Sequence, residues 1–430
     1  MRKKILFLAG MMACCSLAGA QEISKTWVAD KGNGTYQNPV LHADYSDPDV
    51  CAAGDDFYMT ASSFNCIPGI PILHSNDLVN WSLVNCALPI QEPEEFFDKA
   101  QHGKGVWAPA IRFHNGEFYI YWGDPDYGIY MIKAKDPKGR WSKPVLVKAG
   151  KGMIDPTPLW DEDGKVYLVH AYAGSRSGVN SIVVICELNA EGTEVISDPV
   201  MVFDGNDGKN HTVEGPKLYK RNGYYYIFAP AGGVATGWQL VLRSKNIYGP
   251  YESKIVMAQG KTNINGPHQG GWVDTNTGES WFIHFQDKGA YGRVIHLNPM
   301  TWVNDWPVIG VDKDEDGCGE PVTTYKKPNV GKTYPIATPP ESDEFNTRHL
   351  GLQWQWHANK KDTYGFTTDL GYIRLYAGSL SKEFVNFWEV PNLLMQKFPA
   401  EEFTATTKLT FTAKQDGEQT GIIVMGWDYS

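Results

Sequence analysis

Three carboxylates in this chain occur in the same kind of setting, each beside a proline turn and each opening onto a run typical of a β-strand. They are Asp47, Asp155 and Glu214. Held close together, such groups can hydrolyse a glycosidic bond. One donates a proton to the leaving oxygen, a second accepts a proton from water, and a third raises the pKa of the acid by like-charge repulsion. Two other readings fit the same residues, namely calcium binding and simple turn formation by Asp before Pro.

A repeated phrase is expected to position these acids. A turn glycine is followed by a strand-like run with an aromatic residue in the fourth place, at residues 116–120, 164–168, 223–227 and 278–282. Residues 55–59 form a fifth copy, with Asp in place of Gly. The aromatic residues at positions 58, 119, 167, 226 and 281 are therefore 61, 48, 59 and 55 residues apart. Helical periodicity is hard to find, so the chain is predicted to be all-β.

Five units of this length, each with a hairpin, favour a five-bladed β-propeller with four strands in each blade. A large β-sandwich is the alternative. The acids precede the hairpin aromatics by 11, 12 and 12 residues (58 − 47, 167 − 155 and 226 − 214). We therefore expect Asp47, Asp155 and Glu214 at equivalent inner-strand ends, pointing toward one central axis.

Several motifs together resemble glycoside hydrolase family 43, over nearly all of residues 36–325. They lie at residues 38–41, 46–49, 107–109, 154–156, 213–216 and 293–307. The resemblance implies a five-bladed propeller and an inverting mechanism. It also implies that Asp47 is the general base, Glu214 the general acid and Asp155 the carboxylate that sets the pKa of the acid. One departure from the family pattern is residues 298–300 (Asn-Pro-Met), where relatives more often have Gln and Val.

Four further residues gain a role from the resemblance. Phe64 and Trp107 match aromatic walls of the sugar subsite, and Arg293 matches an arginine that bonds sugar hydroxyls. His268 matches a histidine at the channel floor, in some members beside a bound calcium. Without the family, His268 fits a core histidine and Arg293 a surface or ion-paired residue. No cofactor is required on this reading, and a structural calcium ion is the alternative.

The chain divides into four predicted parts. Residues 1–20 read as an export signal, with a basic start, an apolar stretch and a small-residue cleavage site. Residues 21–325 form the catalytic propeller, and the proline-rich residues 326–340 a linker. Residues 341–430 resemble the first part of a concanavalin-like β-sandwich, with strands expected at 352–356, 372–376 and 403–411. We expect the natural protein to continue beyond residue 430.

Composition limits the classes of partner. The net charge is −10 and no basic run occurs, which disfavours nucleic-acid binding. No stretch is long enough to span a membrane. The export signal predicts a periplasmic or secreted protein, with lipoprotein processing at Cys14 or Cys15 as the alternative. The oligomeric state is not indicated.

The expected function is an exo-acting inverting glycosidase that removes terminal pentoses from plant hemicellulose or its oligosaccharides. α-L-Arabinofuranosidase is slightly preferred over β-xylosidase, without support from a particular residue. Two other classes stay open. One is a carbohydrate-binding propeller without catalysis, and the other is a scaffold module stabilised by calcium.

Overall fold

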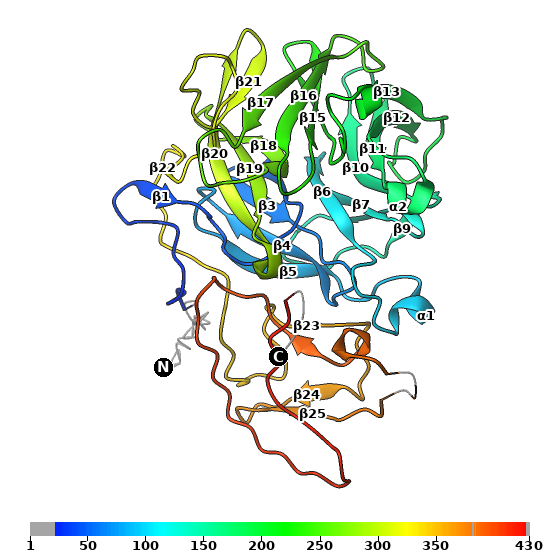
Figure 1. Cartoon of the computed structure of the whole chain (residues 1–430), viewed down its shortest axis with the longest axis vertical. Helices are drawn as coiled ribbons and strands as arrows, with labels where there is room; N and C mark the ends of the chain where they lie inside the picture. The colour runs from blue at the N-terminus through cyan, green and yellow to red at the C-terminus, as the bar shows by residue number, and fades with distance from the viewer. Residues whose placement is uncertain (1–21, 381, 383, 427–430) are drawn as a thin grey trace, which may run out of the picture.

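A computed structural model describes residues 22–380, 382 and 384–426. Five four-stranded antiparallel sheets follow one another around a ring, and a smaller C-terminal part lies beside it (Figure 1). Each sheet uses four strands that are consecutive in the chain. The five-bladed propeller predicted from the repeat is therefore confirmed.

The blades are simple meanders. Blade 1 contains β2 (Asp49–Ala53), β3 (Asp56–Thr60), β4 (Gly69–Ser75) and β5 (Ser82–Leu88). Blade 2 contains β6 (Trp107–His114), β7 (Glu117–Asp124), β8 (Gly128–Ala134) and β9 (Val145–Ala149). Blade 3 contains β10 (Met153–Trp160), β11 (Val166–Tyr172), β12 (Ile182–Leu188) and β13 (Val200–Asp204). Blade 4 contains β14 (Lys217–Arg221), β15 (Tyr224–Ala231), β16 (Trp238–Ser244) and β17 (Glu252–Ala258). Blade 5 contains β18 (His268–Asp274), β19 (Ser280–Asp287), β20 (Arg293–Val303) and β21 (Trp306–Ile309).

Short elements complete the described chain. Two helices of one turn, α1 (Glu94–Phe97) and α2 (Gly174–Ser177), lie in loops, as do the 3-10 turns η1 (Gly205–Asp207), η2 (Gly289–Tyr291) and η3 (Phe387–Glu389). Strand β1 (Thr35–Gln37) pairs with β22 (Thr324–Lys326), joining the two ends of the propeller segment. No helix among the described residues is long and apolar enough to cross a membrane.

The hydrophobic core is divided into five clusters, one at each junction between neighbouring blades. The repeated hairpin aromatic lies in the cluster that faces the next blade. Tyr58 packs between blades 1 and 2, and Tyr119 between blades 2 and 3. Tyr167 and Tyr226 occupy the next two junctions, and Trp281 lies between blades 5 and 1. The repeat seen in the sequence is thus a repeat of inter-blade packing.

Polar contacts reinforce the closure of the ring. The segment before blade 1 runs along β20 of blade 5, where the buried Asn38 side chain donates to the carbonyls of Leu297 and Val322, both at 2.8 Å. Asn38 Oδ1 accepts the Leu297 N–H at 2.9 Å. The amide therefore stands in for a missing strand partner and joins the first blade to the last.

The C-terminal part contains two small sheets. Strand β23 (Gln355–Trp356) pairs with β26 (Leu394–Met395), and β24 (Gly365–Thr367) pairs with β25 (Ile373–Leu375). The strand predicted at 403–411 is wrong, since these residues have no regular structure and their side chains are exposed. Their alternating pattern would suit a half-buried strand, but a strand forms only where a neighbour supplies backbone partners. No described strand does so here.

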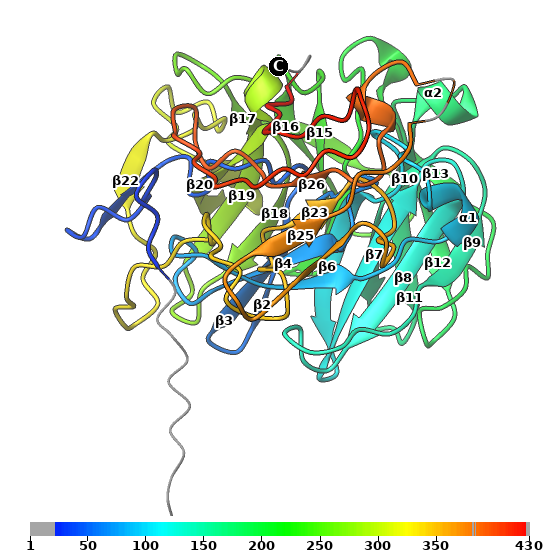
Figure 2. The same ribbon diagram turned by 90° about the horizontal axis from the view of Figure 1, so that it is seen from below.

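The C-terminal part packs on the propeller at the loop that follows Phe64. Ile67 and Trp356 exchange backbone hydrogen bonds, and the Asn65 side chain donates to the His357 carbonyl at 2.8 Å. Figure 2 shows the C-terminal strands crossing in front of the propeller when it is viewed from below. This contact gives the second domain a direct effect on the Phe64 loop. The predicted export signal, residues 1–20, lies outside the described residues.

Closure of the ring through Trp281 can be tested by Trp281→Ala. The side chain is 1% exposed and fills the last junction. Its loss should lower the free energy of unfolding by roughly 3–5 kcal/mol, as for other buried aromatics. The control Tyr291→Ala changes a side chain that is 40% exposed, and we expect a change within about 0.5 kcal/mol. Chemical unfolding followed by fluorescence measures both, and equal effects would contradict the packing role.

Candidate active site

The inner strand of every blade begins with the same backbone feature. Each hairpin aromatic is paired with one residue of the inner strand of its blade. Four residues before that paired residue, the backbone has a positive φ in all five blades. The five residues are Asp47 (φ 55°), Ala108 (41°), Asp155 (58°), Gly215 (61°) and Gln269 (40°). Positive φ is uncommon outside glycine, so its recurrence at one register position marks a constraint shared by all five blades. The five positions converge at one end of the channel.

This register corrects one expectation. Asp47 and Asp155 occupy equivalent positions, but Glu214 lies one residue earlier, in the position taken by Trp107 in blade 2 and His268 in blade 5. Asp155 and Glu214 both precede their hairpin aromatic by 12 residues, although they occupy different register positions. The counts are equal because blade 3 has one more residue than blade 4 between the aromatic and its paired residue on the inner strand. Glu214 thus belongs to the same end of the channel, in a different setting from the two aspartates.

Asp47 is fixed by two side chains from other parts of the ring. Arg293 Nη1 donates to Asp47 Oδ1 at 2.8 Å, and Ser62 Oγ donates to Asp47 Oδ2 at 2.7 Å. Ser62 Oγ in turn accepts the Ala108 N–H at 2.7 Å, which links blade 1 to blade 2. The carboxylate is buried, yet both of its oxygens have partners. Its position is therefore defined before any substrate binds.

Asp155 and Glu214 differ in their environment. Asp155 Oδ2 accepts the Gly215 N–H at 2.7 Å. Burial raises the pKa of Asp155 to about 6, while the Gly215 N–H and the charge of Lys217 oppose the rise. Burial, followed by the charges of Asp155 and Asp47, raises the pKa of Glu214 to about 8. At neutral pH Glu214 is therefore the carboxyl group that carries a proton. Its side chain is 34% exposed and open to a ligand.

The remaining predicted residues lie around these acids. His268 Nε2 is 3.5 Å from Glu214 Oε1, and burial lowers the pKa of His268 to about 3, so its ring is neutral. Phe64 and Val106 exchange backbone hydrogen bonds, which places Phe64 beside the strand that begins with Trp107. Both aromatic side chains are half-buried. Arg293 reaches Asp47 and also lies over the Phe285 ring at 4.8 Å.

Comparison with known proteins identifies the family of the chain. The family model described as glycosyl hydrolases family 43 matches residues 36–307. The chain belongs to glycosyl hydrolase family 43. A second family model, the concanavalin A-like C-terminal domain of β-xylosidases, matches residues 342–430. The family 43 assignment makes this chain a glycosidase, and the second match assigns its C-terminal part to the concanavalin-like sandwich class.

Individual relatives cover most of the chain. A putative β-xylosidase of Xylanibacter ruminicola is 41% identical over 390 residues, which is 90% of this chain and 70% of the relative. A non-reducing end α-L-arabinofuranosidase of Bacteroides ovatus is 30% identical, over 92% of this chain and 74% of the relative. Among solved structures, a xylan β-1,4-xylosidase of Bacillus halodurans superposes with a TM-score of 0.73 and 26% identity. That match covers 85% of this chain and 72% of the other.

The residues around His268 do not suit a calcium ion. Calcium takes about six to eight oxygen ligands, mostly carboxylates and carbonyls. Within the part of the chain that is described, no group of three or more His, Cys, Asp or Glu side chains is arranged to hold a metal. The neutral ring of His268 faces a single carboxyl group, Glu214.

Sequence reasoning missed three side chains that matter to the family 43 site. Ser62 holds Asp47, and it lies two residues before Phe64, the one residue of this stretch to which the sequence gives a role. Asp49 and Lys217 lie two residues beyond Asp47 and Gly215, and both are fully buried. Alternation along a strand could have indicated them, because residues two apart face the same side. Their burial could not be read from the sequence, since each also suits an exposed turn.

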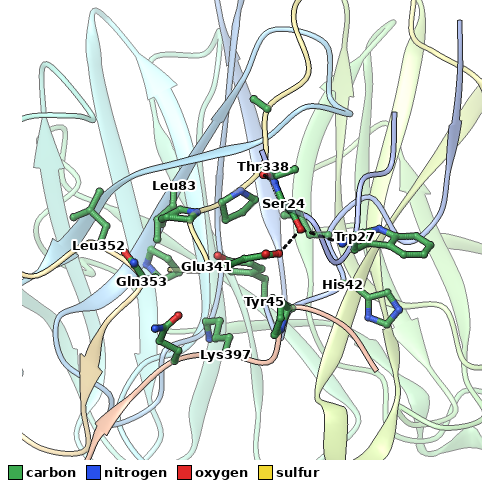
Figure 3. Close-up of a pocket in the computed structure, with 18 of the residues that line it drawn as sticks. Ser24, Trp27, His42, Tyr45, Leu83, Thr338, Glu341, Leu352, Gln353 and Lys397 are labelled. Atoms are coloured by element: carbon green, nitrogen blue, oxygen red, sulfur yellow. Dashed lines mark hydrogen bonds between the residues drawn. The ribbon is translucent and has the colours of Figure 1, made fainter. Parts of the chain in front are cut away.

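A separate hollow lies where the propeller meets the C-terminal part (Figure 3). Trp27, His42, Tyr45, Glu341 and Lys397 line it, and Ser24 donates a hydrogen bond to Glu341 across its edge. None of the seven predicted site residues lines this hollow. It belongs to the contact between the domains rather than to the carboxylate site.

The raised pKa of Glu214 predicts a measurable cost to stability. Between about pH 4.5 and 8 the folded protein keeps a proton on Glu214 that the unfolded chain has lost, so stability falls as pH rises through this window. Glu214→Gln removes the cost and should stabilise the fold at pH 7.5 by roughly 1–2 kcal/mol, after allowance for solvent screening of the exposed third.

The stabilisation should be absent at pH 4, where Glu214 is protonated in both states. Thermal unfolding at the two pH values measures it. The exposed Glu191→Gln serves as the control, with an expected change within about 0.5 kcal/mol. A Glu214→Gln variant no more stable than the parent at pH 7.5 would contradict a protonated Glu214.

Proposed function

We propose that this family 43 glycosidase is an inverting, exo-acting pentosidase and that β-D-xylosides are its principal substrates. The supporting observation is the pairing of two unlike carboxyl groups at one end of the channel. Asp47 is held by an arginine and a serine, whereas Glu214 keeps its proton to a pKa of about 8. One base and one acid at the same opening are what hydrolysis with inversion requires.

The proposed reaction is a single displacement. Glu214 donates its proton to the glycosidic oxygen as the bond from that oxygen to the anomeric carbon breaks. Water attacks the anomeric carbon from the opposite face, and its proton passes to Asp47. Asp155 contributes its negative charge, which raises the pKa of Glu214 and keeps the acid protonated. After product release, exchange with water restores the proton on Glu214 and removes it from Asp47.

Other side chains orient the sugar in this proposal. Phe64 and Trp107 provide apolar walls, and Trp107 is fixed by donation from its Nε1 to the Gly103 carbonyl at 2.9 Å. Arg293 has donors beyond the one that binds Asp47, and these suit sugar hydroxyls. The Phe64 loop is braced by the C-terminal domain through Asn65. This bracing favours a closed pocket for a terminal sugar over a long open cleft.

The choice of xylosides rests on the relatives. The more similar of the two described above is named a putative β-xylosidase, and the C-terminal family model is that of β-xylosidases. The slight preference for arabinofuranosides in the sequence analysis has no support from a particular residue. That activity is the second candidate, because the 30% identical relative is named an α-L-arabinofuranosidase. We further propose export to the periplasm or the medium, where plant hemicellulose oligosaccharides would be met.

The roles of the carboxylates predict unequal effects of substitution. Glu214→Gln should reduce kcat on an alkyl pentoside by at least about a hundredfold, since a poor leaving group needs the proton. An aryl pentoside with an acidic phenol should be much less affected. Asp47→Asn should abolish the hydrolysis of both. Equal losses on the two leaving groups in Glu214→Gln would contradict its role as the acid.

Stereochemistry and pH provide an independent check of the proposed mechanism. Proton NMR of early product should show α-xylose released from a β-xyloside. Retention of the β-configuration would contradict inversion. The rate should fall above about pH 8, as Glu214 loses its proton.

Substrate preference is tested by a side-by-side assay on aryl β-D-xyloside and aryl α-L-arabinofuranoside. We expect kcat/KM to be at least about tenfold higher on the xyloside, the difference that a few hydroxyl contacts provide. Asp47→Asn serves as the control for contaminating activity, because it should abolish the hydrolysis of both aryl glycosides. A preference for the arabinofuranoside would favour the second candidate, and sugar binding without hydrolysis of either would favour a non-catalytic propeller.

A further inference from the structure

A second layer of side chains lies directly behind the carboxylates. Two residues beyond the five positions with positive φ, the inner strands carry buried residues that lie around the same axis, where contacts join neighbouring blades. This layer consists of Asp49, Ala110, Thr157, Lys217 and Gly271. Three of the five have small or short side chains, and Lys217 is the single long one. The channel behind the site therefore has room for its butylammonium chain.

Lys217 is isolated for a buried cation. The residue is 0% exposed, and its Nζ has no hydrogen-bond partner among the described residues. Burial and the charge of Arg112 lower the pKa of Lys217, and the carboxylates of Asp49, Asp155 and Asp47 act in the opposite direction. An ammonium group without any compensating charge would be strongly destabilising in such a place. Its retention in the core therefore depends on neighbouring anions.

Two of the neighbouring anions already have cationic partners. Arg112 Nη1 lies 2.5 Å from Asp49 Oδ2, which also accepts the Ile111 N–H at 2.9 Å. Arg293 Nη1 lies 2.8 Å from Asp47 Oδ1. These pairs leave Asp155 as the ionised carboxylate without a paired cation. Asp155 accepts the N–H of Gly215, two residues before Lys217 on the same strand.

The balance of charge follows from these pairs. The axis holds four carboxyl groups, on Asp47, Asp49, Asp155 and Glu214. It holds three cations, on Arg112, Lys217 and Arg293. Neutrality leaves one carboxyl group to be protonated (4 − 3 = 1). Tyr219 is uncharged and lies under the Arg112 guanidinium at 5.0 Å.

We propose that Lys217 is a positioning residue for hydrolysis, whose ammonium group behind the site keeps Asp155 ionised and so leaves the proton of the group on Glu214. The inference rests on the proposed function, because it concerns the acid and its partner carboxylate. Lys217 touches no substrate. It acts through Asp155, and its effect is a shift in the pH range of activity rather than a loss of sugar contacts.

The test compares Lys217→Met, which keeps the length of the side chain and removes its charge, with Lys217→Arg, which keeps the charge. Removal of this cation raises the pKa of Asp155, so Asp155 loses its charge at a higher pH than in the parent. The acidic limb of the pH profile of kcat/KM should therefore move to higher pH in the Met variant, by about one unit. Below this limb we expect kcat to fall about tenfold with KM within about twofold. The Arg variant should retain the limbs of the parent.

A matched control lies on the same strand. Lys220 is three residues further along and its ammonium pairs with Asp161 at 2.5 Å, away from the channel. Lys220→Met should leave both limbs unchanged. Limbs in Lys217→Met that coincide with those of the parent would overturn the inference. If the Met variant fails to fold, as judged by circular dichroism, Lys217→Gln is profiled in its place with the same two decisive outcomes.

The experiment separates this inference from the proposed function. Full activity of Glu214→Gln on an alkyl pentoside would overturn the proposed function, and the inference with it. An inactive Glu214→Gln together with unshifted limbs in Lys217→Met would overturn the role of Lys217 alone. Shifted limbs in both Lys217→Met and Lys217→Arg would mean that packing, not charge, sets the profile, and would also overturn the inference.

Discussion

Each blade has two apolar faces, and a four-stranded sheet cannot bury either face by itself. The burial has to come from neighbours, and this requirement closes the ring. The hairpin aromatic of each blade fills the junction with the next, and Trp281 completes the circuit against blade 1. Closure brings the five inner strands together around a narrow channel. The site exists because the ring must close, and its residues inherit their positions from that packing.

Residues at the head of each inner strand then share one backbone geometry. A positive φ turns the chain at the same register position in every blade, and the side chains of Asp47 and Asp155 are aligned by it. Glu214 precedes the turn by one residue, and in its blade the turn itself is taken by Gly215. That glycine leaves its N–H directed at Asp155. Because Glu214 lies one residue before the turn, Asp155 accepts a hydrogen bond from the Gly215 N–H, whereas Glu214 lies beside the neutral ring of His268.

The repeated features of this structure could be predicted from the sequence. The hairpin aromatics predicted the blades and their number, and the spacing of the acids predicted one shared opening. The number of residues in each hairpin could not be predicted. Asp155 and Glu214 therefore had equal spacings to their hairpin aromatics, although Glu214 lies one register position earlier. The partners of Asp47 come from positions 15 and 246 residues away, and no local pattern indicates such pairs. Residues 403–411 show the reverse failure, since an alternating pattern without a partner strand forms no strand.

A buried channel lined by acids must also balance its charge, because water cannot screen it there. Asp49 and Asp47 are each paired with an arginine, and the charge of Lys217 acts on Asp155. The fourth carboxyl group is left without a cation of its own. It holds its proton because burial disfavours the charged form and because ionisation would add a negative charge beside those of Asp155 and Asp47. The same group is the one with a face open to a ligand. The channel has one carboxyl group more than it has cations. The group without a cation is Glu214, the one from which a bound glycoside can take a proton.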